Sequence, residues 1–106
     1  MSVRLLYFDG CPHARIAEER LAGALAALGR SGSPVERVRI DDAPPDERAL
    51  FLGSPTFLID GADPFAADGE TGPVMACRVY PTDAGPDGAP SVAQLIVAIE
   101  RVCGIR

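Results

Sequence analysis

The 106-residue chain contains no lysine, no tryptophan and a single histidine, His13. Without lysine it cannot form a Schiff base, and one histidine leaves few ways to build a His-rich metal site. No apolar run approaches the length needed to cross a bilayer. The N-terminal residues do not combine basic residues with a long apolar stretch, as a secretory signal does. We therefore expect a cytoplasmic protein that does not contact a membrane.

Basic residues are in the minority. Fifteen acidic residues against ten arginines give a net charge of −5, which argues against nucleic acid as a partner. The apolar fraction of 47% and the charged fraction of 24% are ordinary for a soluble globular protein. A chain of this length buries a core without help from metals. We expect one domain over residues 1–106, with no cofactor.

The three cysteines, Cys11, Cys77 and Cys103, are an odd number. An odd count without a signal peptide is not a disulfide scaffold. Each cysteine is therefore interpreted separately, starting from the common role of a small buried residue. Cys103 lies one helical turn after Ile99, which indicates a buried helix face.

Hydrophobic spacing predicts seven elements in the order β-α-β-α-β-β-α. Their order indicates the α/β class, with a mixed four-stranded sheet and helices on both faces. The strands are expected at residues 3–8, 35–40, 56–59 and 74–80, and the helices at residues 13–28, 46–52 and from 92 onward, after a Ser91 cap. The last two strands are expected to pair antiparallel. Residues 61–73 form a long loop with Phe65 as its apolar anchor.

Cys11 is the sharpest candidate for chemistry. It follows a strand and the turn Asp9-Gly10, and it precedes Pro12, which suits the first position of a helix. We expect Cys11 at or beside the helix N-cap, where the helix dipole favours a thiolate. A thiolate is a nucleophile and a soft-metal ligand. The alternative is a capping cysteine without chemistry.

A second motif, Gly53-Ser54-Pro55-Thr56, directly precedes the expected third strand. With Cys11-Pro12 and the order of elements, it resembles the thioredoxin fold over nearly the whole chain. The resemblance implies a single thioredoxin-like domain in which Pro55 is cis and packs against the Cys11 sulfur. It also implies that Ser54 offers backbone groups to a bound thiol or peptide.

The resemblance breaks at one position. The family motif is Cys-x-x-Cys, and here the second cysteine is replaced by Ala14. A mixed disulfide on Cys11 therefore needs another thiol for its release. Cys77 is the candidate resolving thiol; the alternative is a core cysteine in a buried strand.

The chain also resembles small actinobacterial-type thioredoxin-like proteins, some of which are labelled alkylmercury-lyase-like. The matching segments are Asp60-Gly61-Ala62-Asp63-Pro64-Phe65 and Cys77-Arg78-Val79-Tyr80. Two thiolates with Asp63 or Asp9 nearby would suit Hg(II) or Cu(I).

His13 has two interpretations, a hydrogen-bond donor to the Cys11 thiolate or an exposed side chain. A zinc site from Cys11, His13 and Cys77 is possible but atypical, so no metal site is predicted.

The leading hypothesis is a thiol-based oxidoreductase or thiol-transfer protein with Cys11 and Cys77 as catalytic residues. Its substrate would be a thiol or disulfide, on a protein or a small molecule. The substrate-binding residues would be Pro12, His13, Ser54, Pro55 and Thr56. The alternatives are a protein that binds a soft metal (mercury or copper) or a thiol ligand, and a non-catalytic interaction module. The sequence does not indicate an oligomeric state.

Overall fold

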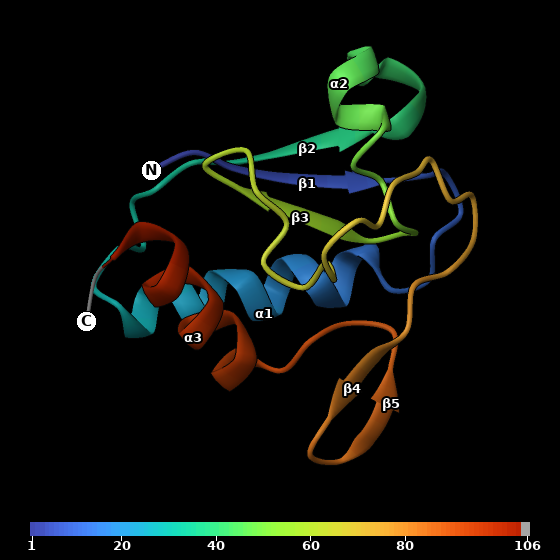
Figure 1. Cartoon of the computed structure of the whole chain (residues 1–106). Helices are drawn as coiled ribbons and strands as arrows, with labels where there is room; N and C mark the ends of the chain where they lie inside the picture. Colours follow the sequence, from blue (N-terminus) through green and yellow to red (C-terminus); the bar gives the residue numbers. More distant parts are fainter. Residues whose placement is uncertain (105–106) are drawn as a thin grey trace.

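The computed structural model describes residues 1–104 and has α/β architecture with mixed strand pairing (Figure 1). The elements, in chain order, are β1 (Val3–Tyr7), α1 (Ala14–Ala27), β2 (Val35–Arg39), a 3-10 turn (Ile40–Asp42), α2 (Pro45–Arg48), β3 (Thr56–Ile59), β4 (Tyr80–Thr82), β5 (Gly85–Asp87) and α3 (Val92–Cys103). Within residues 1–104, no helix is both long and apolar enough to span a membrane.

The main sheet has three strands in the order β2-β1-β3. β1 runs parallel to β2 and antiparallel to β3, so that Val3 lies opposite Val35 on one side and Ile59 on the other. The prediction of a mixed sheet is confirmed. The parallel pair is joined through α1, the crossover that parallel strands require.

The prediction of a fourth strand at residues 74–80 is wrong. Only Cys77 makes a bridge there, and it pairs in parallel with Ser54. Tyr80 begins β4 instead, which forms a separate antiparallel hairpin with β5. Prolines limit strand pairing because they lack an N–H, and residues 74–80 lie between Pro73 and Pro81.

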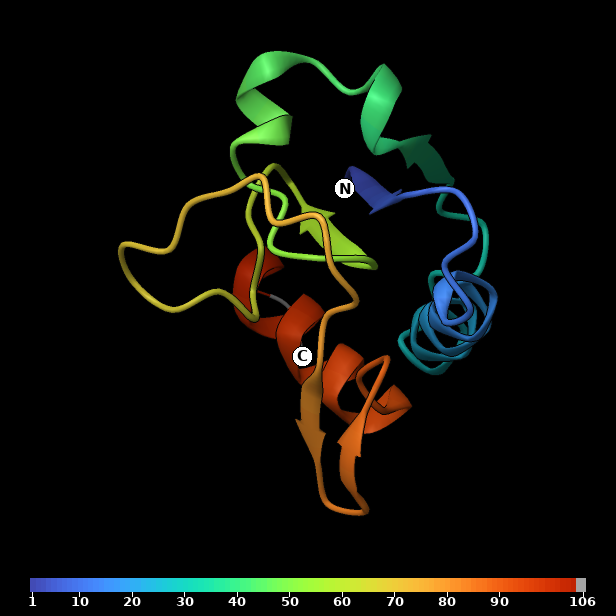
Figure 2. The same cartoon turned by 90° about the vertical axis from the view of Figure 1, so that its right-hand side faces the viewer.

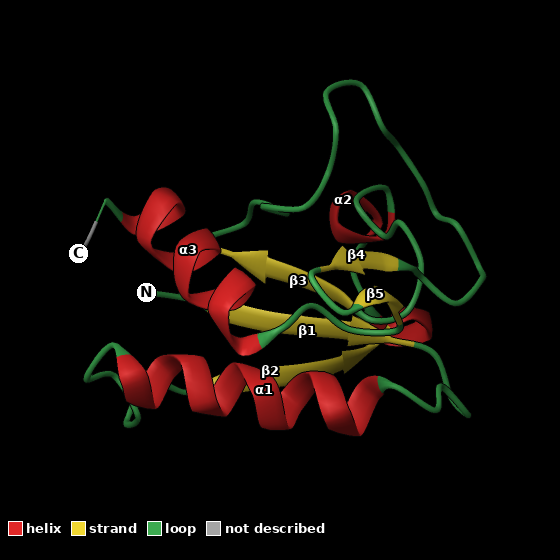
Figure 3. Ribbon diagram, turned by 90° about the horizontal axis from the view of Figure 1, so that it is seen from below, coloured by secondary structure: helices red, strands yellow, loops and turns green. Residues whose placement is uncertain are grey.

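The strands of the main sheet supply two cores because successive side chains point to opposite faces. Val3 and Leu5 of β1 join the larger core, which α1 and α3 cover. Leu6 joins the smaller core, with Ile40 and Phe51. Figure 1 shows α1 and α3 on one side of the sheet and α2 on the other, and Figure 3 shows α3 beside α1 over the sheet. The prediction of helices on both faces is confirmed.

β2 and α2 differ from the expected elements, whereas α3 does not. β2 ends at Arg39, because Ile40 turns into the smaller core. The helix expected at residues 46–52 is a single turn that begins at Pro45. α3 follows the expected cap: Ser91 Oγ accepts from the Gln94 N–H, and Gln94 Oε1 accepts from the Ser91 N–H.

We expect Ser91→Ala to lower the free energy of unfolding by about 1 kcal/mol, because it leaves an N–H of the first turn without its side-chain acceptor. Urea unfolding measures the loss. Ser31→Ala, in the exposed loop after α1, is the matched control and should change stability by less than about 0.5 kcal/mol. Equal losses in the two variants would contradict a role for the cap.

Candidate functional site

Cys11 lies in the connection between β1 and α1, and its side chain is partly exposed. Its N–H donates to Phe8 O at 3.2 Å, which closes a turn through Gly10 in the left-handed region. The turn occupies residues 8–11, which therefore precede the helix. α1 therefore starts at Ala14, with His13 as its N-cap. The expected placement of Pro12 in the helix and of Cys11 at the N-cap is wrong by two residues.

His13 packs against Gly88, which follows β5. A Cβ atom placed on Gly88 would lie 2.2 Å from His13 Cγ. The imidazole is half-buried, and no hydrogen bond links it to Cys11 within residues 1–104. The contact joins the start of α1 to the β4–β5 hairpin, so His13 has a packing role that the sequence did not indicate.

Gly88→Ala is expected to destabilise the fold by about 1–3 kcal/mol, since the new methyl group must displace the ring. Adding His13→Ala should recover most of that loss by emptying the same space. Thermal or urea unfolding of the two single variants and the double variant measures the coupling. Additive losses would show that His13 and Gly88 are not in contact.

The Ser54-Pro55 peptide is cis, as predicted, and Ser54, Pro55 and Thr56 are all buried. Ser54 Oγ accepts from the Phe8 N–H at 3.3 Å. Thr56 Oγ1 donates to Gly53 O at 2.6 Å. These bonds fix the loop that precedes β3 against the end of β1, close in the chain to Cys11.

The backbone of Ser54 is already engaged by the chain itself. Its N–H donates to Ala76 O at 2.9 Å, and its C=O accepts from the Arg78 N–H at 3.0 Å. Cys77 lies between these two partners, opposite Ser54. Figure 2 shows the segment that leads into β4 passing beside the residues before β3. The groups expected to receive a bound thiol or peptide are therefore occupied by residues 76–78.

Cys77 is an exposed free thiol. The alternative of a core cysteine in a buried strand is therefore wrong. The side chain borders a cavity of about 380 Å³, together with Leu52, Glu70 and Pro81. A thiol at the edge of a cavity is accessible to a reagent of small-molecule size.

Arg78 and Asp63 hold the Cys77 segment in place. Arg78 Nη1 lies 2.7 Å from Asp63 Oδ2, and the two side chains are only 9% and 3% exposed. Arg78 Nη2 also donates to Asp63 Oδ1 at 3.5 Å. The two guanidinium nitrogens thus contact the two carboxylate oxygens, and this bidentate geometry is the strong form of an arginine–carboxylate ion pair. The resemblance included the segments that contain Asp63 and Arg78, but no residue spacing predicts that the two side chains form an ion pair.

Tyr80 continues the same cluster. The Arg78 guanidinium lies 4.7 Å from the centroid of its ring, a cation–π geometry. The hydroxyl donates to Pro55 O. Burial raises the pKa of Tyr80 well above its ordinary value, so the hydroxyl keeps its proton. Phe65 packs edge-on against Tyr80, with 5.3 Å between the ring centroids. This contact confirms Phe65 as the anchor of the long loop.

Cys103 lies at the other end of the sheet. Its Sγ donates to Asp60 Oδ2 at 3.6 Å, and Asp60 directly follows β3, whereas Ser54 precedes it. A four-residue strand spans about 13 Å. Cys103 is therefore separated from the Cys11 and Cys77 region by the length of β3.

Burial and then the Asp60 carboxylate raise the pKa of the Cys103 thiol. A raised pKa means less thiolate at any pH below it. We therefore expect iodoacetamide to alkylate Cys103 more slowly than an unfolded control at pH 8. Asp60→Asn should accelerate the reaction, because it removes a charge that disfavours the thiolate. Mass spectrometry of tryptic peptides follows each cysteine. A Cys103 that reacts as fast as in the unfolded chain would contradict this assignment.

No group of three or more His, Cys, Asp or Glu side chains in residues 1–104 is placed to hold a metal ion. Cys11, His13 and Cys77 are therefore not brought together as a ligand set in the described part of the chain. Of the two carboxylates considered beside the thiols, Asp9 pairs with Arg39 at 2.7 Å and Asp63 pairs with Arg78.

Comparisons of the chain with protein-family models, curated proteins and solved structures give no match.

Proposed function

We propose that this chain is a thioredoxin-like thiol–disulfide oxidoreductase in which Cys11 and Cys77 form the redox pair. The observation that carries the proposal is the bridge between Cys77 and Ser54. The Ser54 hydroxyl accepts a hydrogen bond from the Phe8 N–H, and the Phe8 C=O accepts one from the Cys11 N–H. Cys77 is thus flanked by the two residues that hydrogen-bond the Ser54 backbone, and Cys11 is linked to Ser54 through Phe8.

The other features support the same pair. Ala14 removes the usual resolving thiol, and Cys103 is hydrogen-bonded to Asp60 beyond the far end of β3. Cys77 is exposed and Cys11 is partly exposed, so both are open to a reagent. The strand order β2-β1-β3, with the loop of Ser54 and Pro55 before the antiparallel strand, agrees with the resemblance to thioredoxin.

The reaction begins when the Cys11 thiolate attacks one sulfur of a substrate disulfide. A Cys11–substrate disulfide forms, and the other substrate half leaves as a thiolate. The Cys77 thiolate then attacks Cys11 Sγ, which forms the Cys11–Cys77 disulfide and releases the second half as a thiolate. The substrate gains two electrons, the two protein thiols lose them, and an external dithiol restores the protein.

We further propose that the substrate is a small or well-exposed disulfide. A peptide that pairs with Ser54 as a strand would have to displace residues 76–78, which hold both backbone groups of Ser54. A small disulfide needs no such pairing to reach the partly exposed Cys11.

The test is the reduction of 2-hydroxyethyl disulfide by the pre-reduced protein, with Cys103→Ser as the background. We expect one substrate disulfide to be reduced per chain, at a rate well above that of the urea-unfolded protein. Cys11→Ser in the same background should abolish the fast reaction. A rate equal to that of the unfolded chain would overturn the enzyme proposal and favour a non-catalytic module.

A further inference from the structure

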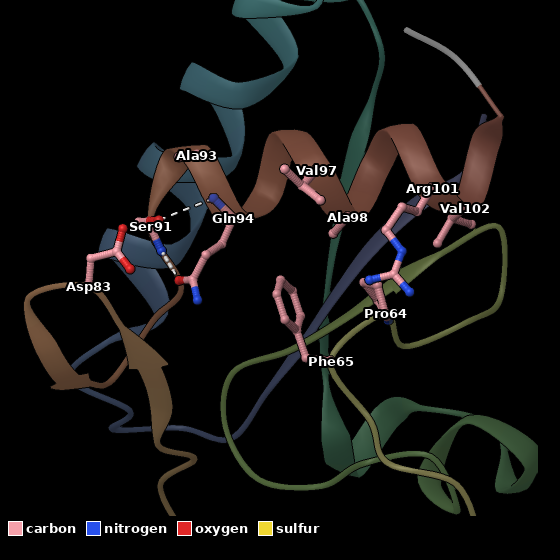
Figure 4. A pocket seen from close by; sticks show the side chains of 10 residues that line it. All are labelled: Pro64, Phe65, Asp83, Ser91, Ala93, Gln94, Val97, Ala98, Arg101 and Val102. Atoms are coloured by element: carbon pink, nitrogen blue, oxygen red, sulfur yellow. Dashed lines mark hydrogen bonds between the residues drawn. The ribbon is translucent and has the colours of Figure 1, made fainter.

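A cavity of about 550 Å³ lies between α3, the Pro64–Phe65 segment and the turn of the β4–β5 hairpin (Figure 4). Small-molecule sites in proteins measure roughly 300–1,000 Å³. The apolar part of the lining comes from Pro64, Phe65, Val97, Ala98 and Val102. Val97 is 51% exposed, although it is a large aliphatic side chain on a regular helix. The size and lining suit an apolar ligand.

Gln94 and Ser91, at the hairpin end of the cavity, already have partners. Gln94 Oε1 accepts from the Ser91 N–H at 2.8 Å, and Gln94 Nε2 donates to Pro81 O at 2.6 Å. Ser91 Oγ accepts from the Gln94 N–H. Asp83, at the same end, lies on the exposed turn of the hairpin. The negative charge of Asp83 means that this end disfavours a ligand's carboxylate.

Arg101 is different. Its side chain extends from α3 across the cavity toward Pro64 (Figure 4). Within residues 1–104, it makes no ion pair and no hydrogen bond, whereas Arg4, Arg20 and Arg78 are all paired. A guanidinium is always charged and carries five N–H donors that match a carboxylate. It is the one charged group in the apolar half of this cavity.

We propose that this cavity binds a small amphipathic acid, with its carboxylate on Arg101 and its apolar body along Phe65 and Val97. Gln94 and Arg101 are seven residues apart on α3, so the body has a path of about 10 Å. That length fits a medium-chain acid. This cavity shares Phe65 and Gln94 with the smaller cavity beside Cys77, but no cysteine lines it, and its test needs no thiol activity.

The test uses the fluorescent anion 8-anilinonaphthalene-1-sulfonate and its displacement by eight-carbon competitors. We expect saturable binding of the dye to the folded wild-type chain. Octanoate should displace it at a clearly lower concentration than octylammonium, which has the same body and the opposite charge. Arg101 is exposed, and Arg101→Gln should weaken octanoate about fivefold, the upper end expected for one exposed ion pair.

Val97→Asp places a carboxylate in the apolar wall and should weaken octanoate by about tenfold or more. Val97 is half-exposed, so this variant should fold, and circular dichroism checks that it does. Arg15→Gln, on the exposed face of α1, is the matched control and should bind octanoate like the wild type. The proposal is overturned if the dye does not saturate, if octylammonium competes as well as octanoate, or if the Arg15 and Arg101 variants behave alike.

Discussion

Oxidation of the reduced wild-type chain with one equivalent of diamide is expected to yield a Cys11–Cys77 disulfide with Cys103 left as a free thiol. The reason is that Cys11 and Cys77 are both linked through Ser54, whereas Cys103 lies beyond the far end of β3. A disulfide needs Cα atoms within about 7 Å of each other. Non-reducing mass spectrometry after trypsin digestion identifies the crosslinked peptide pair.

Cys77→Ser should accumulate a mixed disulfide on Cys11 when a substrate disulfide is supplied, because no second thiol completes the exchange. Cys103→Ser is the matched control and should crosslink like the wild type. If the 11–77 peptide is absent and Cys77 remains a free thiol, the redox pair is wrong. A mixed disulfide on Cys11 would then favour a monothiol role.

Asp63→Asn is expected to cost about 3–5 kcal/mol of unfolding free energy, the largest stability effect predicted for this chain. The substitution leaves the Arg78 guanidinium buried without its counter-charge, which is the costly way to break a buried ion pair. Urea unfolding followed by circular dichroism measures the loss. Amide hydrogen exchange in residues 63–80 should become faster in this variant, because the ion pair anchors that segment.

Asp68→Asn, an exposed position in the same loop, is the matched control and should change stability by less than about 0.5 kcal/mol. Adding Arg78→Met to Asp63→Asn should recover part of the loss, because it removes the unpaired charge. A loss below about 1 kcal/mol for Asp63→Asn would place the pair among ordinary surface ion pairs and contradict its anchoring role.

The elements that the sequence predicted well are those with short-range signals. β3 has the predicted bounds because a proline precedes it and Asp60-Gly61 ends it. α3 begins at its Ser91 cap. Both signals lie within a few residues of the element they define, so they do not depend on the rest of the chain.

The predictions that failed depend on distant partners. The apolar stretch at residues 74–80 has strand propensity, but Met75 and Val79 are exposed, and the neighbouring backbone groups pair with Ser54. The partners Asp63 and Arg78 are fifteen residues apart and follow no periodic spacing. The position of Cys11 depended on how many residues the turn at Gly10 consumes, which the residue types alone do not determine.

The bridge at Ser54 also bears on the open edges of the main sheet. β2 and β3 are the two outer strands of the main sheet, and an open outer strand invites pairing with another chain. At the outer side of β3, Cys77 pairs with Ser54 near the start and Ala62 with Ile59 at the end. β2 instead carries Glu36, Arg37 and Arg39, charges that discourage such pairing. The two edges of the sheet therefore differ: backbone bridges occupy positions at both ends of β3, whereas charged side chains line β2.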